Sequence, residues 1–175
     1  YQPEPEELDL PKPDYHKAYA FYEEAIKLEV GPELREKIRF NMGEMKFLAA
    51  DYYTARREYE KYLKEFDPHW NPHYTSDRDI TFSHQGHFIY EARLKLAETF
   101  LHVSSFTYAR IVLEDLITLT RKDPSSGEKS SLYRRLASRR LPYAYRFPRP
   151  DSDYELESGI KEVRNFLKNY PSDSM

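Results

Sequence analysis

The densest run of charge in the sequence is basic and lies toward its C-terminal end. Between residues 129 and 150 there are seven cations and no acidic residue: Lys129, Arg134, Arg135, Arg139, Arg140, Arg146 and Arg149. Because the whole chain has a formal charge of −3, the residues outside this segment carry −10, which is −3 less the +7 of the segment. Arginine pairs with carboxylates and phosphates through a planar fork of donors and stacks on aromatic rings. The segment therefore predicts a surface that meets anionic groups.

Several anionic targets fit this segment. They are the acidic helices of the protein itself, an acidic surface on a partner protein, the phosphates of RNA or DNA, and anionic lipid headgroups. Tyrosine, tryptophan and arginine are also the residues that dominate protein interfaces. The predicted contact residues are therefore the following eight: Arg134, Arg135, Arg139, Arg140, Tyr143, Tyr145, Trp70 and Tyr74.

A second group that could do chemistry is a set of four histidines in or beside one proline-containing stretch: His69, His73, His84 and His87. Their spacings suit a metal site, to which Asp77 and Asp79 could add oxygen ligands, and this leaves a metal-assisted enzyme as one hypothesis. However, the chain has no cysteine and no HExxH motif. Histidines in a surface loop more often form hydrogen bonds and packing contacts. We therefore expect no metal site.

Other catalytic signatures are missing from the sequence. There is no GxGxxG or GxxxxGK[ST] phosphate loop and no GxSxG nucleophile motif, and no pair of carboxylates stands out among the 30 acidic residues. Cysteine chemistry is excluded, since the chain has none. The expectation is a non-enzymatic protein without a cofactor. RNA or DNA binding through the Arg/Tyr-rich segment 129–150 is the main alternative to protein binding.

Three stretches of the chain share one spacing pattern, which predicts the elements that carry these residues. Ala18, Ala55 and Ala109 are each followed by a bulky residue four positions on and by another apolar residue three positions later. These offsets place the three side chains on one face of a helix. A proline closes each stretch, at residues 32, 68 and 124, where a helix would end.

Two of the stretches are preceded by a second helical pattern. Its small residue, Gly43 or Ala97, lies twelve positions before Ala55 or Ala109. A small residue on each helix lets two backbones approach closely, so the spacing predicts helical hairpins. In the last part of the chain, Val163, Phe166, Leu167 and Tyr170 align with Tyr59, Tyr62, Leu63 and Phe66. This predicts a fourth unit whose aligned residues form the same core seam.

These positions resemble the tetratricopeptide repeat, in which each unit is a pair of antiparallel helices. The resemblance implies an all-α solenoid of about three to four repeats over residues 14–171. Two insertions, at about 67–86 and 141–153, interrupt the array. Both contain aromatic residues, so we expect them to be ordered and packed on the solenoid or on a partner. Residues 1–13 form an acidic, proline-rich arm and residues 172–175 a tail.

The last unit ends in Phe166-Leu167-Lys168-Asn169-Tyr170-Pro171. This ending is similar to repeats of the BamD-like outer-membrane assembly lipoproteins. That similarity implies a protein-docking scaffold in the periplasm or cell envelope, a subunit of a membrane-associated complex with a lipid anchor N-terminal to Tyr1. A cytoplasmic location is the alternative. No apolar run approaches the ~20 residues of a membrane helix.

Overall fold

The structure is a computed structural model that describes residues 12–70, 85–123 and 127–173. All regular structure in these ranges is helical, which confirms the predicted all-α class. The elements are α1 (Tyr15–Ala25), α2 (Pro32–Leu48), α3 (Tyr52–Phe66), α4 (Ile89–His102), α5 (Phe106–Lys122), α6 (Gly127–Arg140), the 3-10 helix η1 (Leu141–Tyr145) and α7 (Asp153–Asn169).

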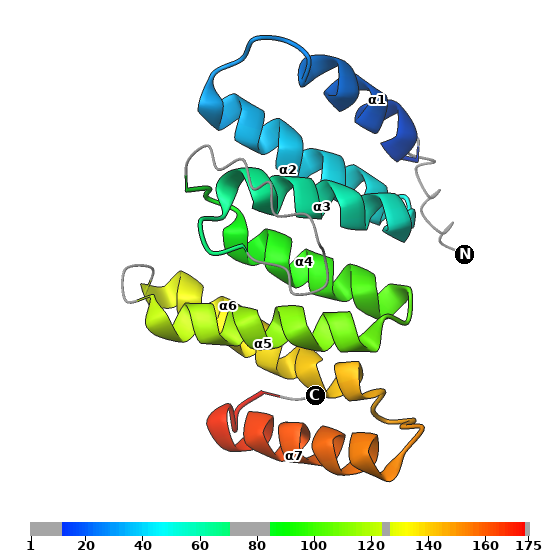
Figure 1. Ribbon diagram of the computed structural model, residues 1–175, viewed down its shortest axis with the longest axis vertical. Coiled ribbons are helices and arrows are strands. Elements are labelled where there is room, and N and C mark those ends of the chain that lie inside the picture. The colour runs from blue at the N-terminus through cyan, green and yellow to red at the C-terminus, as the bar shows by residue number, and fades with distance from the viewer. Residues whose placement is uncertain (1–11, 71–84, 124–126, 174–175) are drawn as a thin grey trace, which may run out of the picture.

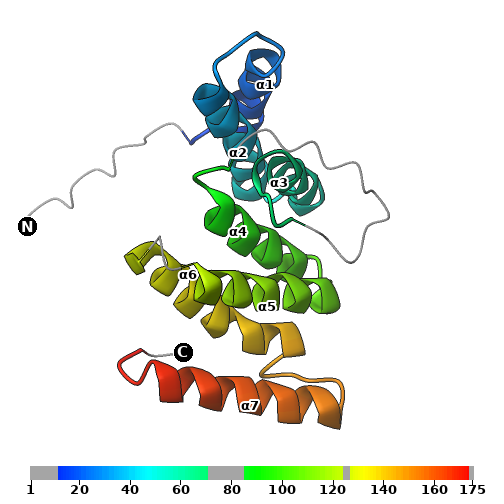
Figure 2. The ribbon, with the colours of Figure 1, turned by 60° about the vertical axis from the view of Figure 1, so that its left-hand side comes forward.

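The helices are stacked in the order in which they occur in the chain, from α1 at one end to α7 at the other (Figure 1). Each helix runs antiparallel to the one before it, and each from α2 to α6 packs against its predecessor, whereas α7 packs mainly against η1 (Figure 1). The axes also rotate along the stack: α3 is seen nearly end-on in Figure 2, whereas α5, α6 and α7 lie across the view. The result is an elongated, twisted array of helices whose two ends carry α1 and α7.

Two successive hairpins, α2–α3 and α4–α5, turn in the same way. Ala50 and Ser104, which lie 54 positions apart, both have a φ of 58°. The next residue in each turn donates its N–H to a carbonyl five positions back, from Asp51 to Lys46 at 3.0 Å and from Ser105 to Phe100 at 2.8 Å. These bonds satisfy carbonyls that a helix end leaves free. The structure thus repeats one tight turn where the sequence repeats one pattern.

The buried core is centred on α3, α4 and α5 and extends to η1. The small positions predicted from the sequence are buried, since Ala55, Ala97 and Ala109 are fully inaccessible. Gly43 of α2 faces the ring of Tyr59, and a Cβ atom at this glycine would lie 2.6 Å from that ring. The close approach of α2 and α3 therefore requires a residue without a side chain at position 43.

The first long connection, between α3 and α4, is fixed at its N-terminal end by a buried ion pair. Arg93 Nε lies 2.7 Å from Asp67 Oδ2, and both side chains are inaccessible. Arg93 also donates to the carbonyl oxygen of His69 at 3.2 Å and lies over the Trp70 ring at 5.2 Å. Residues 67–70 are thus held against α4.

The C-terminal end of the same connection is fixed by Glu36 of α2, whose side chain is buried. Its carboxylate accepts hydrogen bonds from the Tyr62 hydroxyl at 2.8 Å and from the His87 backbone at 2.5 Å. Gly86 lies so close that a Cβ atom there would be 2.5 Å from the Tyr62 hydroxyl oxygen. Both described ends of the predicted insertion at 67–86 are therefore packed on the helices.

The connection from α6 to α7 departs from the hairpin turns. It contains η1 and runs over twelve residues, from 141 to 152, where the other two hairpins use three. Leu141, Pro142, Ala144 and Tyr145 are buried, so the predicted insertion at 141–153 is packed on the helices of its own chain. Because η1 separates α7 from α6, α7 buries only Gly159 and Phe166. Leu167, which we predicted in the core seam, is 44% exposed, and that part of the prediction is wrong.

Candidate interaction surface

Helix α6 carries the predicted arginine cluster and displays part of it outward. Ser130 and Ala137 form its buried face. Arg135 and Arg139 are four residues apart, so they lie one above the other on a helical face. Both residues are half-buried. The local sequence thus presents two guanidinium groups from one helix, as we expected from the run of basic residues.

Much of the basic segment is neutralised inside the molecule. Lys129 lies 3.0 Å from Glu91, and Arg140 lies 3.0 Å from Glu98, both on α4. Arg146 pairs with Asp151 and, at 3.4 Å, with Glu155. The internal alternative that we considered for this segment therefore accounts for these three cations.

The other four arginines of the segment form fewer ion pairs. Arg135 reaches Asp173 near the end of the chain, at 3.4 Å, and both side chains are partly exposed. Arg134, Arg139 and Arg149 have no ion pair with any residue of the described ranges. Three positive charges are thus left for a ligand from outside, and Arg139 is the one that lies beside a pocket.

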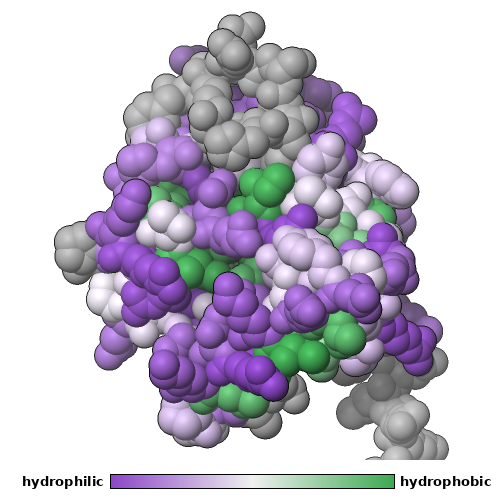
Figure 3. All heavy atoms as spheres, turned by 60° about the horizontal axis from the view of Figure 1, so that its bottom comes forward, coloured by the Kyte–Doolittle hydropathy of each residue, from purple (hydrophilic) through white to green (hydrophobic). Residues whose placement is uncertain are grey.

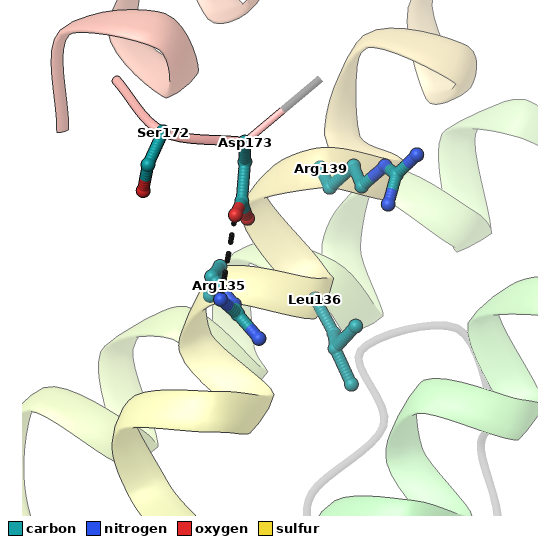
Figure 4. Close-up of a pocket in the computed structure, with 5 residues that line it drawn as sticks. All are labelled: Arg135, Leu136, Arg139, Ser172 and Asp173. Carbon is teal, nitrogen blue, oxygen red and sulfur yellow. Dashed lines mark hydrogen bonds and ion pairs between the residues drawn. The ribbon is translucent and has the colours of Figure 1, made fainter. Parts of the chain in front are cut away.

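That pocket has a volume of about 240 Å³ and lies between α6 and the segment that follows α7. It is lined by Arg135, Leu136, Arg139, Ser172 and Asp173 (Figure 4). The Asp173 carboxylate points toward Arg135, while the Arg139 side chain extends along α6 away from that pair. Arg139 can donate charge-assisted hydrogen bonds to a carboxylate or phosphate, whereas Arg135 already pairs with the carboxylate of Asp173.

The aromatic contact residues that we predicted do not share one location. Tyr143 of η1 is 37% exposed and lies on the same stretch as the arginines. Tyr145 is 7% exposed and lies under Arg110, whose guanidinium is 4.9 Å from its ring centre. Burial, followed by the charge of Glu114, raises the pKa of the Tyr145 phenol. Tyr145 is therefore a packing residue, which corrects its assignment as a surface contact.

Trp70 also has a structural position. It is 4% exposed, belongs to the core and lies under Arg93. Its assignment as a partner contact is corrected because the ring is enclosed in the core, where Arg93 lies over it. Tyr74, the last of the eight predicted contacts, lies outside the described residues.

The histidines are dispersed where the structure describes them. His69 and His87 are exposed, and His87 Nδ1 lies 3.1 Å from Glu36 Oε2. His73 and His84, like Asp77 and Asp79, fall outside the described residues. In the part of the chain that the structure describes, no three His, Asp or Glu side chains form a group that could hold a metal ion.

Sequence reasoning missed the buried polar residues that position the insertion. Asp67 was predicted only as the first residue of an insertion, and no role was predicted for Glu36. Asp67 and Arg93 are 26 positions apart, and Glu36 and His87 are 51 apart. The only sequence signal was that an acidic residue, Glu36, falls seven positions before Gly43, on the helical face that is predicted to approach the next helix.

Comparison of the chain with protein-family models, with curated proteins and with solved structures finds no match. Among the described residues, no helix combines the length and the apolar character needed to cross a bilayer. The functional assignment therefore depends on the geometry of the surface itself.

Proposed function

We propose that the protein is a non-enzymatic scaffold that binds an acidic surface of a partner protein through the arginines of α6. The observation that carries this proposal is Arg139, which lines a pocket beside Arg135 and has no ion pair within the described residues. The nearby contact of Asp173 with Arg135 supports a carboxylate as the preferred group. Exposed Tyr143 extends the same surface with an aromatic side chain.

We further propose that the helices form a tetratricopeptide-like solenoid. Support comes from the equivalent turns at Ala50 and Ser104 and from the buried small residues Ala55 and Ala109. In this interpretation α1 is the second helix of an incomplete first unit, and α6 and α7 form a last unit that η1 has pushed apart. A scaffold of stacked hairpins suits protein docking because it offers long surfaces with little rearrangement.

The location that we propose is the periplasm or cell envelope, in a membrane-associated complex. This rests on the similarity of the helix ending at residues 166–171 to outer-membrane assembly lipoproteins, and on the acidic, proline-rich arm as a tether. Fractionation of cells that express the natural gene tests it. Recovery with the envelope after spheroplast formation is the expected result, and recovery only with cytoplasmic proteins would contradict it.

The binding proposal is tested with a defined acidic probe. A fluorescein-labelled octaglutamate peptide is titrated with the protein by fluorescence anisotropy, and Arg139→Glu should weaken binding by about tenfold, since reversal replaces attraction by repulsion. The matched control is Arg57→Glu, an exposed arginine of α3 that also lacks an ion pair within the described ranges. Equal losses in both variants would show that only net charge matters and would refute a site at α6.

The same assay distinguishes a protein ligand from a nucleic-acid ligand. A fluorescein-labelled oligouridylate of equal charge replaces the peptide, at low and at physiological salt. We expect weaker binding of the oligonucleotide than of the peptide at physiological salt. Tighter binding of the oligonucleotide, with a steep loss on adding salt, would favour the nucleic-acid alternative over the proposed function.

A further inference from the structure

The displacement of α7 by η1 leaves a second hollow, separate from the pocket at Arg139. It is a groove of about 430 Å³ between α5 and α7. Its floor is apolar and contains the buried side chains of Ile117, Leu141 and Phe166. Figure 3 shows the α7 end of the molecule, where separate apolar patches are set among hydrophilic side chains. A groove with an apolar floor and polar walls is typical of a site that binds a ligand in one orientation.

The walls of the groove are two helical faces of equal length. On α5 they are formed by Glu114, Thr118 and Arg121, and on α7 by Glu162, Asn165 and Asn169. In each set the outer two residues are seven positions apart, which corresponds to about 10 Å of helix at 1.5 Å per residue. That length matches about three residues of extended peptide at 3.3 Å each.

One end of the groove is acidic. Glu114 of α5 and Glu162 of α7 both line the groove, and the charge of Glu162 adds to burial, the larger cause, in raising the pKa of Glu114. Arg110 acts in the opposite direction on Glu114, but its guanidinium is stacked on the Tyr145 ring. The two carboxylates thus exceed the one neighbouring cation, and this end has room for another positive charge.

The other end of the groove is basic. Arg121 is exposed and has no ion pair within the described ranges. Asn169 lines the groove on the α7 side, and Asn165 and Thr118 line it between the two ends. Amide and hydroxyl side chains both donate and accept hydrogen bonds, so they suit the N–H and C=O groups of a peptide backbone.

We propose that this groove binds an extended peptide segment of a partner protein. The segment has a basic side chain at Glu114 and Glu162, an apolar side chain on the floor, and an acidic side chain at Arg121. Charge complementarity at both ends selects this ligand over a uniformly acidic or basic one. The site uses none of the arginines of α6, so it goes beyond the function proposed above and can fail or succeed independently of it.

The first test is a titration of the ¹⁵N-labelled protein with the capped peptide Lys-Leu-Ser-Glu, followed by NMR. We expect saturable shifts at the backbone amides of Thr118, Asn165 and Asn169. The peptides Lys-Leu-Ser-Lys and Glu-Leu-Ser-Glu should each bind about two- to fivefold more weakly, the usual value of one half-exposed ion pair. Equal binding of the three peptides, or shifts confined to other helices, would overturn the proposal.

The second test exchanges the charge of the protein. Glu162→Lys should weaken binding of Lys-Leu-Ser-Glu and should strengthen binding of Glu-Leu-Ser-Glu, a gain that misfolding cannot produce. The matched control is Glu157→Lys, since Glu157 is an exposed residue of α7 that does not line the groove. Arg121→Glu should favour Lys-Leu-Ser-Lys, with Arg164→Glu as its control. If the control variants change peptide preference equally, the groove is not the site.

Discussion

The two regular hairpins, α2–α3 and α4–α5, and the last pair, α6–α7, use their polar residues differently. In the hairpins Asp67 and Arg93 are buried against each other, and Glu36 is buried beneath Tyr62 and His87. In the last pair η1 separates the helices, and Arg135 and Arg139 line an open pocket. The hairpins therefore bury these charged side chains, whereas the separated pair leaves Arg135 and Arg139 accessible to a ligand.

The two regions should differ most in how much stability is lost when one ion pair in each is broken. Asp67→Ala should lower the free energy of unfolding by about 3–5 kcal/mol, because it leaves the Arg93 guanidinium buried without its carboxylate. Asp173→Ala, which breaks the exposed pair with Arg135, should cost about 0.5 kcal/mol or less. Urea unfolding followed by circular dichroism measures both values. Similar losses for the two variants would remove the distinction between the regions.

A smaller loss is expected where α2 meets α3. Gly43→Val should cost about 1–3 kcal/mol, since the new side chain meets the Tyr59 ring. The control is Gly31→Ala, because nothing lies within 4 Å of a Cβ atom at Gly31. That variant should change stability by about 0.5 kcal/mol or less. Thermal unfolding checks both, and a neutral Gly43→Val would mean that the hairpin is loosely packed.

At the other end of the molecule the change should appear in binding. Asp173→Asn removes the carboxylate that competes for Arg135, so octaglutamate should bind about two- to fivefold more tightly. Anisotropy titration of the variant and of Asp153→Asn, an exposed position at the start of α7, measures the effect. Unchanged or weaker binding in the Asp173 variant would indicate that the pocket does not accept a carboxylate.

The smallest effect concerns Glu114, whose pKa is raised mainly by burial. A raised pKa means that the folded state disfavours the carboxylate form of Glu114. This lowers the free energy of unfolding at pH values above the folded pKa. The loss vanishes as the pH falls below the unfolded pKa of about 4.3, because the group is then protonated in both states. Glu114→Gln should therefore stabilise the protein by a few tenths of a kcal/mol at about pH 7 and not at about pH 3. Urea unfolding at both pH values measures the change in the free energy of unfolding. A lower stability of the variant at pH 7 would contradict the prediction.

Local spacing predicted the fold well. The positions of Ala55, Ala97 and Ala109 gave the helices of the two regular hairpins, because helix periodicity and close packing both depend on residues near in sequence. The two insertions fell where the structure has its long connections. The exposure of Leu167 was not predictable in this way, since it depends on how far η1 displaces α7.

The candidate surface was predicted only in part. The run of basic residues identified α6, but the ion pairs of Arg140 with Glu98 and of Lys129 with Glu91 depend on which helices become neighbours. The burial of Trp70 depends on Arg93, 23 positions away. Their residue types led us to predict Trp70 and Tyr145 as interface residues, but packing against other helices places both in the core.

Photo-crosslinking at two exposed tyrosines tests most directly whether the separated pair is the interaction surface. Tyr143 of η1 and Tyr53 of α3 are each replaced by p-benzoylphenylalanine in cells that naturally express the protein. We predict a discrete crosslinked product at position 143 that Arg139→Glu abolishes, and none at position 53. A product at position 53 alone, or one at position 143 that persists in Arg139→Glu, would contradict the account.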